Sequence, residues 1–146
     1  MRSILIVIIF LILPITLIHA YHQTIVRHTI PAFNDDNCIR ALIGEYATSD
    51  NKGMKLMAHA IRNRGTLKGV YGFNAPHVDR ENKNTWIDAT FAWLESANEV
   101  DPLDGANEWR SIADIERHGA PKGFTFVKFY DGIYYYKPTA KTRSNK

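Results

Sequence analysis

The hydrophobic residues of this chain recur mostly at three- and four-residue intervals, which is the spacing of one face of an α-helix. Ile39, Leu42, Ile43 and Tyr46 follow this spacing and predict a first helix over residues 36–47. Asn and Asp side chains stand directly before it, and these residue types cap helix N-termini. The N-terminal part of the domain is therefore predicted to open with a capped amphipathic helix.

A second helix is predicted to begin after residues 49–51, where Ser, Asp and Asn are each suitable N-cap residues. Gly65 suits the position just past its end, because a left-handed residue commonly closes a helix there. Its buried side is predicted to consist of Met54, Met57, Ala58 and Ile61.

A third helix is predicted over residues 86–98. Thr85 and Asp88 resemble a capping box, with Asp in place of the more usual Glu or Gln. The spacing of three large apolar residues predicts that they form its buried face, namely Ile87, Phe91 and Leu94.

The remainder of the chain combines loops, one short helix and a hairpin. Residues 65–84 read as a long functional loop, and Ser111 caps a short helix that ends at His118. Asp131-Gly132 separates two β-prone runs, which is a strong hairpin signal. Helices first and one small hairpin last predict an α+β domain that is mainly helical.

The N-terminus carries an apolar segment that does not belong to this domain. Arg2 is followed by residues 4–18, which are almost wholly Ile, Leu, Val and Phe. This pattern indicates a secretory signal peptide, with an uncleaved signal anchor as the alternative. The predicted organisation is a signal peptide or anchor at 1–20, a linker at 21–34, a catalytic domain at 35–138 and a basic tail at 139–146. The domain is thus expected outside the cytoplasm, in the periplasm or the extracellular cell envelope.

Composition excludes several classes of protein. The 146 residues suffice for one domain with a core, and the net charge of +3 is too small to indicate a nucleic-acid partner. Cys38 is the only cysteine, so no internal disulfide forms, and we expect it to be packed. No P-loop, dinucleotide fingerprint or clustered metal-ligand spacing is present, so neither a cofactor nor a metal is predicted.

Glu45 is the main catalytic candidate. It lies three residues after Leu42 and one before Tyr46, at the flank of an apolar stripe. A carboxyl group held against apolar neighbours resists ionising, as a general acid near neutral pH must. Glycosidic bonds break only when such an acid protonates the leaving oxygen. The alternative is an ordinary helix-flank glutamate whose tip is solvated.

Three stretches in this order resemble one family. They are Ile43-Gly-Glu45-Tyr-Ala47, then residues 58–72 with Asn63-Arg64 and Val-Tyr71-Gly72, then residues 101–109 from Asp-Pro-Leu-Asp-Gly to Trp109. Together they resemble the SleB-like cell wall hydrolases of the spore-cortex-lytic type, which occur in bacteria and their phages. The similarity covers residues 38–136.

The resemblance implies a lysozyme-like domain that cleaves the glycan strands of peptidoglycan as a monomer. Glu45 would protonate the oxygen between N-acetylmuramic acid and N-acetylglucosamine. Members are thought to act as lytic transglycosylases, in which the sugar's C6 hydroxyl closes on C1. The alternative is hydrolysis with a second carboxylate as base, for which Glu95, Asp101 and Glu108 are the candidates.

The resemblance also indicates substrate-binding residues. Asn63 would bind an N-acetyl group or, alternatively, its own helix terminus. Tyr71, Phe73 and Trp109 are candidate platforms for sugar rings, with a role in the core as the alternative for each. Arg64 and His59 are expected to be structural, and His59 to be hydrogen-bonded.

Two positions depart from the family pattern. Glu108 stands where members often have histidine, and a histidine is also usual near the place of Gly132. Glu108 is itself a candidate substrate-binding residue. If the histidines position substrate in the family, this protein would prefer a different glycan or be weakened. If they only shape the cleft, nothing changes. A non-catalytic wall-binding module and a membrane-tethered envelope protein remain alternatives to an enzyme.

Overall fold

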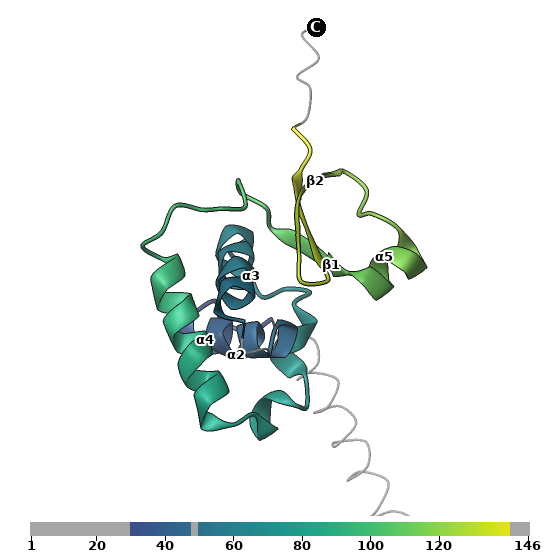
Figure 1. Cartoon of the computed structure of the whole chain (residues 1–146). Helices are drawn as coiled ribbons and strands as arrows, with labels where there is room; N and C mark the ends of the chain where they lie inside the picture. The colour runs from purple at the N-terminus through teal and green to yellow at the C-terminus, as the bar shows by residue number, and fades with distance from the viewer. Residues whose placement is uncertain (1–29, 48–49, 141–146) are drawn as a thin grey trace, which may run out of the picture. The chain divides into compact units, whose positions relative to one another are not determined.

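Three helices pack together on one side of the domain in the computed structural model, which describes residues 30–47 and 50–140 (Figure 1). They are α2 (Asp35–Glu45), α3 (Asn51–Arg64) and α4 (Lys83–Ser96). Helix α2 contacts both α3 and α4. Helices α3 and α4 also contact each other, so the three helices pack pairwise.

The first two helices begin and end nearly where the sequence predicts. The Asn34 side chain accepts a hydrogen bond from the Asn37 N–H at 2.9 Å and caps α2. Asp50 caps α3, and Gly65 ends it with a φ of 65°. The predicted end of α2 is wrong by two residues, because Tyr46 leaves the helical conformation with a φ of −150°.

The core forms chiefly between these helices. The predicted buried side of α3 is confirmed, since Met54, Met57, Ala58 and Ile61 are fully buried. Leu42 and Ile43 of α2 are buried as well. Removal of this apolar surface from water is the main stabilising term of the fold.

Helix α4 differs at both ends from its prediction over residues 86–98, and the predicted capping box of Thr85 and Asp88 is wrong. It begins at Lys83 and ends at Ser96, and the Asn82 side chain accepts a hydrogen bond from the Thr85 N–H at 3.0 Å. Asn82 is therefore the N-cap, and Thr85 lies within the first turn.

The predicted buried face of α4 is also wrong. Its apolar positions are Ile87, Phe91 and Leu94, and they are 40%, 58% and 50% exposed. The side that packs on α2 and α3 instead carries Ala89, Ala92, Trp93 and Ser96. Small residues let the helices approach closely, and the indole N–H of Trp93 donates to Asp35 at 2.7 Å.

The segment between α3 and α4 contains two short 3₁₀ helices, η1 (Tyr71–Asn74) and η2 (Val78–Arg80). Arg40 of α2 fixes both of them. Its Nε donates to the carbonyl of Phe73 at 3.0 Å, and its Nη1 forms an ion pair with Asp79 at 2.6 Å. Both short helices are consequently held against α2.

A three-stranded antiparallel sheet completes the domain, with α5 beside it (Figure 1). The predicted hairpin is confirmed as β2 (Phe124–Tyr130) and β3 (Ile133–Pro138). Asp131 and Gly132 both have positive φ values, as a type I′ turn requires. The strand β1 (Glu108–Ser111), which the sequence pattern did not predict, pairs with β3, so the order is β1-β3-β2.

Helix α5 (Ile112–His118) follows β1 without a break. Ser111 caps it as predicted, and the Asp114 side chain completes a capping box. Hydrogen bonds from Ser111 hold the pKa of Asp114 below its ordinary value.

The observed mixture of helices and a small sheet belongs to the predicted α+β class. The apolar segment at 1–20, the linker up to residue 29 and the tail from residue 141 lie outside the described residues. Within the described ranges, no helix combines the length and hydropathy of a membrane span.

Candidate active site at the end of helix α2

The last turn of α2 lies directly against η1, because glycine occupies both sides of the contact. A Cβ at Gly44 would stand 1.8 Å from the carbonyl oxygen of Gly72. A Cβ at Gly72 would stand 2.5 Å from the backbone nitrogen of Glu45. Only glycine at these two positions permits the backbones to approach so closely.

This close approach positions the side chain of Glu45. The backbone N–H of Gly72 donates to Glu45 Oε1 at 2.6 Å. The indole Nε1 of Trp109, on β1, donates to Oε2 at 2.8 Å. Both carboxyl oxygens are thus held by donors from separate segments, and the half-buried group has a fixed orientation.

Glu45 lies on the wall of a cavity of about 440 Å³. Its walls come from the end of α2, the end of α3, the loop before η1, strand β1 and helix α5. The residues that line it are Glu45, Arg64, Gly69, Tyr71, Glu108, Trp109, Arg110, Ser111, Asp114, His118 and Ile133. A cavity of this size falls in the range that holds small-molecule ligands.

Arg64 connects three parts of this wall. Its guanidinium forms an ion pair with Glu108 at 2.8 Å and donates to the carbonyl of Lys68 at 2.9 Å. Its Cζ also lies 5.4 Å from the centre of the Trp109 ring. These are the contacts of a structural residue, and they keep in place the indole that binds Glu45.

Glu108 is enclosed between two arginines. One carboxylate oxygen pairs with Arg64 and the other pairs with Arg110. Its side chain is only 13% exposed, although it lines the cavity. Substrate binding by Glu108, which was predicted from the sequence, stays a prediction. Its observed partners show that it joins α3 to β1.

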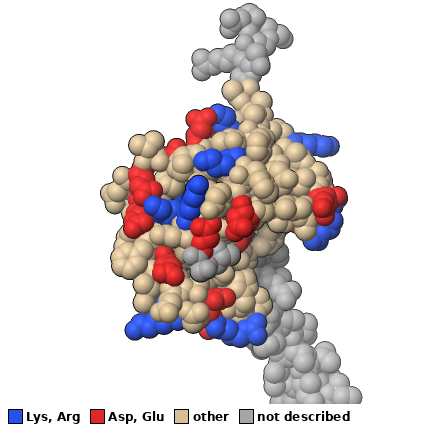
Figure 2. All heavy atoms as spheres, in the orientation of Figure 1, with Lys and Arg blue, Asp and Glu red and all other residues tan. Residues whose placement is uncertain are grey.

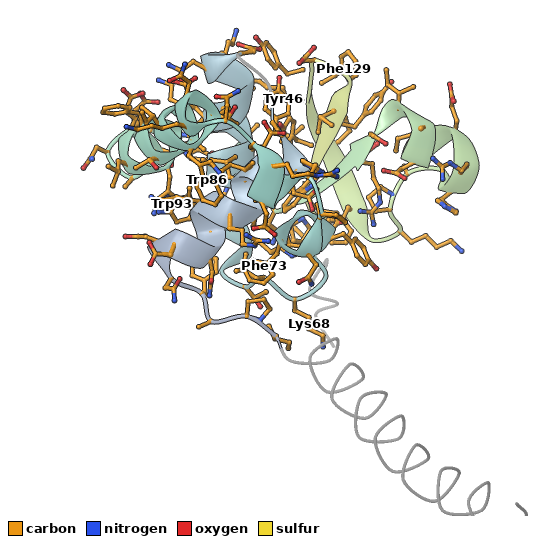
Figure 3. All side chains as sticks on the ribbon, turned by 90° about the horizontal axis from the view of Figure 1, so that it is seen from below. Tyr46, Lys68, Phe73, Trp86, Trp93 and Phe129 are labelled. Atoms are coloured by element: carbon orange, nitrogen blue, oxygen red, sulfur yellow. The ribbon has the colours of Figure 1, made fainter. Side chains whose placement is uncertain are left out.

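Two of the three predicted sugar platforms lie in the cavity wall. Tyr71 is 87% exposed there, and Trp109 is 8% exposed with its indole turned to Glu45. Phe73, by contrast, is half-buried, with the guanidinium of Arg40 5.7 Å from its ring centre. Phe73 therefore packs against the core; it is labelled in Figure 3.

Asn63 is not part of this cavity wall. Its side-chain amide donates to Asp101 at 2.9 Å and to the carbonyl of Ala106 at 3.0 Å. These bonds fasten the loop before β1 to the end of α3. Recognition of an N-acetyl group by Asn63 stays a prediction.

The other candidate bases, Asp101 and Glu95, lie outside the cavity wall. Burial would raise the pKa of Asp101, but hydrogen bonds from Gly105, Leu103 and Asn63 hold it below its ordinary value. Glu95 lines a separate cavity of about 320 Å³ beside α3 and pairs with Lys55 at 3.4 Å.

Several residues of the wall were missed from the sequence, among them Arg110, Asp114 and His118. The short helix predicted after Ser111 could have indicated two of them. Asp114 and His118 are four residues apart and so share one face of the short predicted helix. The missing information was that this helix lies opposite the end of α2.

Cys38 is packed as predicted, and His59 is buried, but the expectation that His59 is hydrogen-bonded is wrong for its Nε2, and its Nδ1 lies 3.8 Å from Asp101. His59 is 3% exposed, and its Nε2 has no hydrogen-bond partner among the described residues. Burial lowers its pKa, while Asp101 and Glu99 oppose that shift. Cys38 is fully buried, and burial raises the pKa of its thiol to about 11, so it does not act as a nucleophile.

Comparisons with protein-family models, with curated proteins and with solved structures find no match for this chain. The resemblance to SleB-like hydrolases therefore rests on the residues alone. In the ranges that the structure describes, no three His, Cys, Asp or Glu side chains are grouped as a metal site would require.

Proposed function

We propose that this protein cleaves the glycan strands of peptidoglycan between N-acetylmuramic acid and N-acetylglucosamine, with Glu45 as the catalytic acid. One observation carries the proposal. The half-buried carboxyl of Glu45 lies on the wall of the 440 Å³ cavity, and donors from Gly72 and Trp109 fix both of its oxygens. A positioned carboxyl beside a cavity is what protonation of a glycosidic oxygen requires.

The two donors are compatible with the acid form of Glu45. A protonated carboxyl keeps acceptor lone pairs on both oxygens, so it can accept from the Gly72 and Trp109 N–H groups while its own O–H points elsewhere. In this proposal the O–H faces the cavity that Glu45 lines. The proton passes from there to the bridging oxygen of the bound glycan.

The surroundings favour a reaction that needs one protein carboxyl. The other two carboxylates in the cavity wall are already engaged, Glu108 by two arginines and Asp114 by Ser111. In the single-carboxyl scheme the sugar's C6 hydroxyl attacks C1 as the bridging oxygen leaves with the proton. The Glu45 carboxylate then accepts the proton of that hydroxyl, which leaves a 1,6-anhydro end.

The surface charge is compatible with a glycan partner. On the face drawn in Figure 2, acidic and basic side chains are interspersed rather than gathered into one field of a single sign. Such a face lacks the basic stripe typical of nucleic-acid binding. The apolar segment at 4–18 supports export to the cell envelope, where the substrate is found.

The Glu45→Gln variant tests the proposal. Glutamine keeps the shape and one carbonyl acceptor but has no transferable proton. We expect clearing of peptidoglycan in a gel to vanish while binding to purified sacculi persists. Glu95→Gln is the matched control, because Glu95 is 46% exposed at a separate cavity, and it should clear normally.

Each result has a defined meaning. Undiminished clearing by Glu45→Gln would assign the chemistry to another group. Binding by the wild-type chain without any clearing would make the protein a wall-binding module instead of an enzyme.

A further inference from the structure

The outer face of the sheet carries exposed aromatic rings that the core does not use. Phe126 and Phe129 of β2 are 53% and 47% exposed. Both rings contact Tyr134 of β3, with centroids 6.2 Å and 4.6 Å away. We call these three residues the aromatic strip. A contiguous exposed patch of this kind marks an interaction surface more often than scattered single residues do.

The strand register shows which face the strip occupies. Phe129 is paired with Tyr134, and Tyr134 is paired with Arg110 of β1. Residues opposite one another in an antiparallel sheet point to the same side, so this row crosses all three strands on one face. The neighbouring row on that face runs from Phe126 through Tyr136 to Glu108.

The other face of the sheet packs on the domain core. Tyr135 is fully buried and Trp109 is 8% exposed, and both lie between the residues of the two rows. The fold is therefore stabilised from that side. On the face of the strip Tyr136 is also buried, beside the Phe126 ring at 6.0 Å, but Phe126 and Phe129 themselves are about half exposed.

Both rows end at β1 beside the cavity, but Tyr136 in the second row is only 5% exposed, so the accessible path is the row of Phe129, Tyr134 and Arg110. The β1 members of the two rows, Arg110 and Glu108, line the cavity that contains Glu45. Trp109, which holds Glu45, lies on the opposite face, so the cavity reaches the strip around the β1 edge of the sheet. An extended polymer is the kind of occupant that could contact both the cavity and the strip.

We propose that the aromatic strip binds the peptidoglycan glycan strand beyond the bond that is cleaved, and this rests on the proposed function. The apolar faces of sugar rings pack on aromatic rings, and the Tyr134 hydroxyl offers a polar contact beside them. A second copy of the chain is the less suitable occupant. The register of β2 shifts between Phe126 and Lys128, and such an irregularity bends an edge strand away from regular pairing with another chain.

The test measures binding of the full chain, kept in mild detergent, to purified sacculi by co-sedimentation. All proteins carry Glu45→Gln, so that the glycan stays intact. We expect Phe129→Ala to bind roughly tenfold more weakly, and Phe126→Ala together with Phe129→Ala to bind weaker still, because each ring loses one stacking contact.

Phe91→Ala is the matched control. Phe91 is 58% exposed on α4, where it lines an apolar groove with Trp86, and Figure 3 shows Trp86 well apart from Phe129. This variant should bind as the parent does. Circular dichroism of all variants establishes that the folds are equal.

The outcomes separate this inference from the proposed function. Equal binding by the strip variants and Phe91→Ala would overturn the strip. The inference would also be overturned if analytical ultracentrifugation showed an oligomer of the parent chain that dissociates in the strip variants. The face would then be a self-association surface. Weaker binding by the strip variants with no clearing by the wild-type chain would refute the cleavage reaction but retain the strip.

Discussion

Replacing Gly44 by alanine tests the contact that positions Glu45. In the interior of a helix, alanine is favoured over glycine by about 1 kcal/mol. Here the added Cβ would lie 1.8 Å from the Gly72 carbonyl oxygen and 2.3 Å from its carbon. Both are backbone atoms, so α2 and η1 must separate before the contact reaches an ordinary 3.4 Å.

The magnitude follows from two losses and one gain. Overpacking of this kind costs about 1–3 kcal/mol. The separation also breaks the 2.6 Å hydrogen bond from Gly72 to Glu45, a loss of roughly 0.5–1.5 kcal/mol for the protonated carboxyl of the proposal. After the propensity gain is subtracted, Gly44→Ala should destabilise the protein by about 0.5–3.5 kcal/mol.

Urea unfolding followed by tryptophan fluorescence measures this change, and a peptidoglycan clearing assay measures the displacement of Glu45. Gly65→Ala serves as the control. Gly65 has a φ of 65°, and a Cβ added there would meet no atom within 4 Å, so alanine should cost about 1–2 kcal/mol without moving the cavity. We expect both variants to be less stable than the wild type. Only Gly44→Ala should lose peptidoglycan clearing under conditions in which the variant is still folded.

A Gly44→Ala variant as stable as the wild type, or more stable, would contradict this expectation. Helix propensity would then outweigh the contact, and the backbones of α2 and η1 could not approach as described. Equal losses of clearing in both variants would show that general destabilisation accounts for the effect.

Three further predictions concern single side chains. Trp109→Phe removes the indole N–H that donates to Glu45 at 2.8 Å, so the rate of peptidoglycan clearing should fall by about tenfold or more. The circular dichroism spectrum should stay that of the wild type. Full clearing activity would refute the role of this hydrogen bond. Burial lowers the pKa of His59 below 6.5, so at a slightly acidic pH the unfolded chain binds a proton at His59 that the folded protein does not. The urea midpoint of unfolding should therefore fall as the pH drops from about 6.5 through the pKa of the folded state. The His59→Leu variant should lack this fall in the urea midpoint. The Cys38 thiol, with its pKa raised to about 11 by burial, should react with a thiol reagent only after unfolding, and rapid reaction of the native protein would contradict that.

Most of the fold could be predicted from local sequence signals. The cap at Ser111 and the turn at Asp131-Gly132 have their predicted roles, and the caps Asn34 and Asp50 each come from a predicted set of candidates. Such positions are readable because the hydrogen bonds involved join residues close in sequence.

Helix α4 shows where local patterns fail. It carries apolar residues on both of its faces, so spacing alone permits two buried sides. The structure selects the side of Ala89, Ala92 and Trp93, because small residues allow close contact and the Trp93 indole finds Asp35. That choice depends on the partners α2 and α3, which no window within α4 contains.

The candidate site was predictable only in part for the same reason. Glu45 was found from its place beside an apolar stripe. Its two hydrogen-bond donors come from Gly72 and Trp109, 27 and 64 residues away, and only the fold brings them together. Strand β1 was missed because it has four residues, too few for a clear alternation.

Mass analysis of digested peptidoglycan is the decisive test of Glu45 as the acid that cleaves the glycan. Sacculi are incubated with the wild-type chain and with Glu45→Gln, and the released fragments are weighed. We expect 1,6-anhydro-muramic ends from the wild type and none from the variant. Fragments cut in their peptides, or anhydro ends that persist when Glu45 is replaced, would show that the proposed reaction is wrong.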